Sequence, residues 1–116
     1  MIDPLVSQGE VECQLWLLCA ALETETGEFE KRATEAAVAE ADYKIQVAHA
    51  WLDCAVDRPK ITVGERQARA EVASSVELRA FKIAEARRNS TKEALSSYRA
   101  RLDSLRSLLA SIRAQT

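Results

Sequence analysis

The chain has 116 residues, and Ala, Leu, Glu, Arg, Lys and Gln dominate it, with only 3 Gly and 2 Pro. Strong helix formers with so few helix-breaking residues leave little material for a β-sheet, so the composition predicts a single all-α domain. The formal net charge of −2 is unevenly divided, because residues 1–59 hold 4 of the 16 basic and 12 of the 18 acidic side chains. Residues 60–116 are therefore basic.

Several function classes are disfavoured by composition and spacing. The apolar residues 15–22 are too few to span a bilayer, and the acidic stretch before them lacks the positive charge of a secretory signal. Cys13, Cys19 and Cys54 show no CxxC spacing and His49 is the single histidine, so we predict reduced thiols, no metal site and no cofactor. No nucleophile and base stand at a recognisable spacing, so we expect no enzyme. We expect a soluble, cytoplasmic protein without membrane contact.

The first predicted helical segment is apolar around most of its circumference. One stripe follows the spacing 4, 3, 4 and consists of Val11, Leu15, Leu18 and Leu22. Trp16, Leu17 and Cys19 widen it. A helix of this kind needs burial on more than one side, so the pattern predicts an additional N-terminal apolar helix that is partly covered by another subunit, with Leu15, Leu18 and Leu22 in the oligomer interface.

The second predicted segment carries a heptad seam of mostly small residues. The seam consists of Phe29, Ala33, Ala36, Glu40, Tyr43, Val47, Ala50 and Cys54. Only one potential breaker, Gly27, separates it from the first segment, and a lone glycine costs a helix about 1 kcal/mol relative to alanine. Two alternatives follow: a tight turn at Gly27, or one kinked helix over residues 8–56.

The clear break lies at residues 57–61, where Pro59 disfavours a helical conformation at the residue before it. Thr62 and Glu65 then have the spacing of a capping box. No glycine or proline follows Gly64, so we predict one basic helix over residues 62–115, about 75 Å long at 1.5 Å per residue.

The last predicted helix has a strong apolar seam near its end, consisting of Leu95, Tyr98, Leu102, Leu105, Leu109 and Ile112. An isolated helix cannot bury such a seam. We therefore predict a long antiparallel helical hairpin with coiled-coil character. Its C-terminal seam is expected to pair with neighbouring chains in a ring-forming oligomer through Leu95, Leu102, Leu105 and Leu109.

Basic side chains accompany this seam at heptad spacing: Lys92, Arg99, Arg106 and Arg113. Arg101 lies on the opposite flank, and Arg87 and Arg88 lie upstream. Two interpretations remain open. These side chains either pair with acids of the first helices, such as Glu40 or Asp42, or form a track for single-stranded nucleic acid. Tyr98 is either a core residue or a stacking partner for a base.

The C-terminal half contains three runs to compare with known families: ERQARA (65–70), FKIAEARR (81–88) and EALSSYRARLDSL (93–105). These runs resemble the UvsY-like recombination mediators of tailed phages. Two shorter runs, ADYK (41–44) and AHAWL (48–52), look like the first helix of that family. The resemblance covers residues 41–113 and leaves the segment around residues 11–22 unaccounted for.

This resemblance implies a ring-forming protein that binds single-stranded DNA and assists loading of a RecA-like recombinase onto strands coated with single-strand-binding protein. It also implies a phage-encoded protein working in a bacterial host cell. Family members carry a Leu-Lys-Ala-Arg-Arg-Thr segment linked to DNA binding, and residues 84–89 come closest to it. Arg87 and Arg88 match, whereas Glu85 places an acid where the family has a base.

The leading hypothesis is therefore a non-enzymatic recombination mediator. Its predicted DNA-binding residues are Arg87, Arg88, Lys92, Arg99, Arg101 and Arg106. The alternative is a small helical protein-binding module, such as a phage factor that docks on a host or phage protein through its apolar N-terminal helix without binding nucleic acid.

Overall fold

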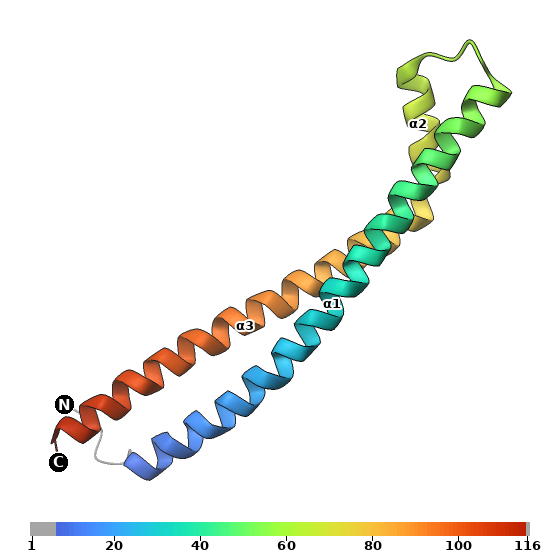
Figure 1. The fold of residues 1–116 in the computed structure, drawn as a ribbon. Coiled ribbons are helices and arrows are strands. Elements are labelled where there is room, and N and C mark those ends of the chain that lie inside the picture. Colours follow the sequence, from blue (N-terminus) through green and yellow to red (C-terminus); the bar gives the residue numbers. More distant parts are fainter. Residues whose placement is uncertain (1–6, 116) are drawn as a thin grey trace. The chain divides into compact units, whose positions relative to one another are not determined.

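The computed structural model describes residues 7–115, and within this range the chain forms helices and no strands (Figure 1). The helices are α1 (Gln8–Asp57), α2 (Val63–Ala73) and α3 (Ser75–Gln115). The prediction of an all-α fold is confirmed. The helices contribute to two packing units, residues 7–30 with 90–115 and residues 31–89.

Helix α1 begins at a capping box that we did not predict from the sequence. The Ser7 hydroxyl accepts a hydrogen bond from the Glu10 backbone N–H at 3.1 Å, and the Glu10 carboxylate accepts one from the Ser7 N–H at 3.5 Å. The helix then continues through Gly27, so the tight-turn alternative is wrong and the continuous helix is correct. Beside Gly27, the Thr26 hydroxyl donates to the Leu22 carbonyl one turn earlier, at 2.7 Å, which satisfies this hydroxyl within the helix.

The break after α1 and the start of α2 follow the sequence prediction. Helix α1 ends at Asp57, before Pro59, and the Thr62 hydroxyl caps α2 by accepting from the Glu65 N–H at 3.2 Å. The Glu65 carboxylate contacts Arg69 one turn later, at 3.3 Å. Thr62 thus supplies the cap, and the acid is engaged along its own helix.

The prediction of one helix over residues 62–115 is wrong, because the chain leaves the helical conformation at Ser74. This residue has φ −104° and ψ 16°, and its N–H is shared between the carbonyls of Ala70 and Glu71. Ser74 is 0% exposed, and Ala70, one turn earlier, is also buried. Neither glycine nor proline stands there, so the break leaves no marker in the sequence.

The unit made of residues 7–30 and 90–115 pairs the first half of α1 with the end of α3 (Figure 1). Its core joins Val11 of α1 to Leu109 and Ile112 of α3, and Leu15, Leu105 and Leu108 pack against them. Because the start of α1 meets the end of α3, the two helices are antiparallel here.

The residues predicted to face neighbouring chains lie in this intrachain packing. Leu18, Leu95, Leu102 and Leu109 are buried, and Leu15, Leu22 and Leu105 are partly buried. Within residues 7–115, α1 packs against this seam, and the expected role of the seam between subunits stays a prediction. The apolar side chains that α1 leaves exposed in this unit are Trp16 and Leu17.

In the unit formed by residues 31–89, the second half of α1 packs against α2 and the start of α3. The Tyr43 and Phe81 rings stack with centroids 6.3 Å apart and an angle of 18° between their planes. The Arg66 guanidinium lies 4.2 Å from the Trp51 ring centroid, and its Nε donates to the Trp51 carbonyl at 2.7 Å. The predicted small-residue seam is buried in this unit at Ala36 and Ala50.

Candidate nucleic-acid interface

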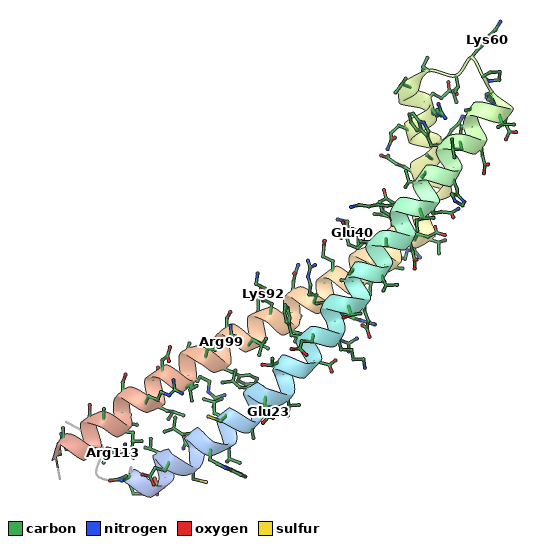
Figure 2. The ribbon with its side chains drawn as sticks, viewed as in Figure 1. Glu23, Glu40, Lys60, Lys92, Arg99 and Arg113 are labelled. Carbon is green, nitrogen blue, oxygen red and sulfur yellow. The ribbon has the colours of Figure 1, made fainter. Side chains whose placement is uncertain are left out.

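The heptad-spaced bases lie on α3, where Lys92, Arg99 and Arg113 follow one another toward the C-terminus (Figure 2). No proline or glycine interrupts the helix between them. The regular spacing therefore becomes a stripe along one flank of the buried leucine seam.

Within residues 7–115, Arg113 is the one basic side chain of the stripe that forms an ion pair with an acid of α1. Arg113 Nη2 lies 3.3 Å from Glu12 Oε1. The pKa of Glu12 is lowered from its ordinary value of 4.5, first by a hydrogen bond from Gln8 and then by the hydrogen bond and charge of Arg113. The interpretation that the stripe pairs with acids of the first helix is thus confirmed at one position, with Glu12 as the acid.

The antiparallel register explains why the pairing does not continue. Counted in heptads from the Glu12–Arg113 contact, Arg106 is expected opposite Cys19 and Arg99 opposite Thr26. Both of these positions are neutral. Within residues 7–115, no ion pair joins an acid to Lys92, Arg99, Arg101 or Arg106, so their charges remain available to a ligand.

Arg101 lies in a shallow groove between α1 and α3 in the same unit. The groove consists of two adjoining open depressions that share Gln14, Arg101 and Leu105. Ser97, Ala100 and Ser104 line one side, and Leu17, Leu18, Ala21 and Tyr98 line the other. We call this surface the Arg101 groove. It combines an exposed guanidinium with an amide, two hydroxyls and an aromatic ring.

Tyr98 fits neither of the two sequence interpretations alone. It is partly buried in the leucine seam and it also lines the Arg101 groove. A ring held in this way has little conformational freedom to lose when a base stacks on its accessible part.

Arg87 and Arg88 belong to the unit of residues 31–89, where neighbouring acids compensate part of the charge. Arg88 Nη2 lies 3.9 Å from Glu85 Oε2, and Lys82 Nζ lies 3.6 Å from the other oxygen of that carboxylate. Arg88 also donates to the Asn89 side-chain oxygen at 3.4 Å. Arg87 is exposed and has its own interaction within the chain.

A second acid acts on Arg88 from α1. The pKa of Glu40 is lowered mainly by Lys44, whose Nζ lies 2.8 Å away, and to a smaller extent by the charge of Arg88. Asp42, the other acid suggested by the sequence, is exposed and makes no ion pair within residues 7–115. Glu85 and Glu40 therefore compensate part of the charge of Arg88.

Gln14 and Glu12 were not predicted from the sequence to be parts of the site. Both residues lie on α1. Their position beside α3 can be inferred only when the direction and the offset of the helix pairing are known. No group of three or more metal-ligating side chains occurs among residues 7–115. Over the same range, no helix has an apolar stretch long enough to cross a membrane.

Comparisons of the chain with protein-family models, with curated proteins and with solved structures find no match.

Proposed function

We propose that this protein binds single-stranded nucleic acid through the Arg101 groove and the adjacent bases of α3. The observation that carries the proposal is that Lys92, Arg99, Arg101 and Arg106 form no ion pair within residues 7–115. Such basic side chains attract the phosphates of a nucleic-acid backbone, because each contact releases counterions condensed on the strand.

A single strand fits this surface better than a duplex. An unpaired base has a free face that can stack on Tyr98 while Arg101 holds the adjacent phosphate, and Gln14 adds a hydrogen-bonding amide in the same groove. A duplex reader would instead need side chains on a helix that enters the major groove. Here the buried flank of α3 is occupied by α1, and the accessible ring lies at a helix–helix groove.

The wider role that we propose is recombination mediation, with a RecA-like recombinase and single-strand-binding protein as partners. The resemblance to UvsY-like mediators supports this role, together with a basic surface suited to single strands. In this proposal Lys92, Arg99, Arg101 and Arg106 are the main DNA-binding residues. Arg87 and Arg88 also contribute, and Arg88 contributes less because Glu85 and Glu40 act on it.

Fluorescence anisotropy with a labelled oligothymidine tests the binding. Affinity is expected to fall steeply with salt, and replacing both Arg99 and Arg101 by Ala should reduce the slope of log affinity against log salt by about 1.4, at about 0.7 per lost phosphate contact. Arg113→Ala is the matched control, because Glu12 already neutralises that side chain. Absence of binding at low salt, or an equal loss in the control, would overturn the proposal.

The register between α1 and α3 allows a second test in which every basic side chain is kept. Cys19→Glu places an acid opposite Arg106, where an ion pair is expected to compete with phosphate and weaken binding. Cys19→Gln has nearly the same size and no charge, so it should leave affinity unchanged. Equal affinities for the two variants would show that Arg106 does not contact the strand.

One observation favours a second candidate function, the docking of another protein on the start of α1. Trp16 is 72% exposed and Leu17 is 56% exposed, and adjacent large apolar side chains are typical of binding surfaces. Trp16→Ala should abolish such docking and leave oligonucleotide binding intact. If it weakens oligonucleotide binding instead, Trp16 belongs to the nucleic-acid surface.

A further inference from the structure

Helix α1 has a second apolar seam that the rest of the chain does not cover. It follows the spacing 3, 4, 3, 4, 3 and consists of Val38, Ala41, Ile45, Ala48, Leu52 and Ala55, which we call the outer seam. Val38 and Ile45 are each 57% exposed and Leu52 is 62% exposed. A regular seam of this kind on a solvated helix is typical of a coiled-coil contact.

The outer seam is distinct from the one that packs within the chain. Ala36, Tyr43 and Ala50 face the intrachain partners of α1, and each outer-seam residue Val38, Ile45 and Leu52 follows one of them by two positions. Two residues correspond to about 200° around a helix, so the two seams lie on opposite faces. This part of α1 is therefore apolar on both sides.

The sizes of the outer-seam residues favour a partner helix that runs antiparallel to α1. Large residues occupy one heptad position, Val38, Ile45 and Leu52, and alanine occupies the other at 41, 48 and 55. In an antiparallel pair of identical seams, every layer brings a large residue against an alanine. A parallel pair would stack alanine on alanine in alternate layers and leave voids, which close-packed interfaces avoid.

The charges beside the seam agree with this direction. The antiparallel arrangement brings Asp42 of one copy beside His49 of the other, where the imidazole N–H can donate to the carboxylate, and it does so twice by symmetry. Lys44 then stands opposite Trp51. A parallel pair would instead bring Lys44 near His49 of the second copy, with no acid between them.

We infer that the outer seam binds a second copy of this chain, as an antiparallel homodimer with paired layers Val38–Ala55, Ala41–Leu52 and Ile45–Ala48. The complementarity of size and charge with itself identifies the occupant. This contact lies in residues 31–89, apart from the leucine residues first expected to mediate assembly. It does not depend on the proposed nucleic-acid binding.

Sedimentation equilibrium over a protein concentration series tests the association. The chain is expected to dimerise, and Ile45→Glu should raise the dissociation constant at least about tenfold by placing two carboxylates in the central layers. Val76→Glu is the control, because Val76 is also an exposed aliphatic residue, at 76%, and lies on α3 outside the outer seam. A monomeric parent chain, or an equal effect of both variants, would overturn the inference.

Disulfide trapping tests the direction independently. In a background with Cys13→Ser, Cys19→Ser and Cys54→Ala, the single variants Asp42→Cys and His49→Cys are oxidised separately and as a mixture. The mixture should cross-link efficiently and each variant alone poorly, because like positions are about seven residues out of register, beyond disulfide reach. Efficient cross-linking of either variant with itself, or a mixture that cross-links no better than each variant alone, would contradict the antiparallel assignment.

Discussion

Truncation of Leu109 tests whether the leucine seam of α3 is a core within one chain. Leu109 is buried and packs with Val11 and Ile112. Leu109→Ala removes buried methyl groups and leaves a cavity, which costs about 3 kcal/mol for a leucine at a site of this kind. Since a domain of this size is stabilised by about 5–15 kcal/mol in total, the loss is large. Leu17→Ala, at an exposed position on α1, should change stability by less than about 0.5 kcal/mol.

Urea denaturation followed by circular dichroism measures both variants. The decisive comparison is the difference between Leu109→Ala and the parent chain at low and high protein concentration. An intrachain core predicts the same difference at all concentrations, since any association elsewhere is common to both proteins. A difference that shrinks on dilution, or a cost as small as that of Leu17→Ala, would refute the intrachain packing and favour a seam shared between subunits.

Three further outcomes follow from single contacts. In an NMR titration, Gln8→Ala and Arg113→Ala should each raise the pKa of Glu12, and an unchanged pKa in either variant would refute that contact. Because this pKa is lowered in the folded state, the carboxylate favours folding above pH 4.5 and loses that effect as the pH falls through the folded-state pKa. Ser74→Ala should not destabilise the protein in urea, and should stabilise it by up to about 1 kcal/mol, since the buried hydroxyl finds no partner within residues 7–115. Thr62→Ala should cost about 1 kcal/mol in the same assay by removing the cap of α2, and an unchanged midpoint would refute that role.

Local chemistry made much of the fold predictable. The end of α1 before Pro59 and the cap at Thr62 depend on one or a few neighbouring residues, so a single sequence contains the information. The break at Ser74 lies at a small buried side chain, and a serine in a helical sequence carries no mark of it. The heptad spacing identifies the leucine seam as an apolar face of the helix. It does not show which helix covers that face, because periodicity carries no information on the packing partner.

The candidate site was predictable to a similar extent. The heptad spacing of Lys92, Arg99 and Arg106 indicated the stripe, and Glu85 indicated that Arg88 has an acidic neighbour. The Arg101 groove was not predictable, since it needs the offset between two helices that are far apart in the sequence. That offset is set by side-chain packing in the core.

The uneven division of charge between the two halves of the chain takes on a physical meaning once this offset is known. An acidic helix paired with a basic one is expected to cancel its charge, and Glu12 with Arg113 shows that the pairing is possible here. Seven and fourteen residues after Glu12, the corresponding positions of α1 are Cys19 and Thr26, which carry no negative charge. The offset thus decides which basic side chains are neutralised. Glu at those two positions would be expected to compensate Arg106 and Arg99 and to leave only Lys92 and Arg101, of the four proposed residues, for phosphate. The proposed nucleic-acid surface therefore depends on the neutral residues opposite the stripe as well as on the arginines.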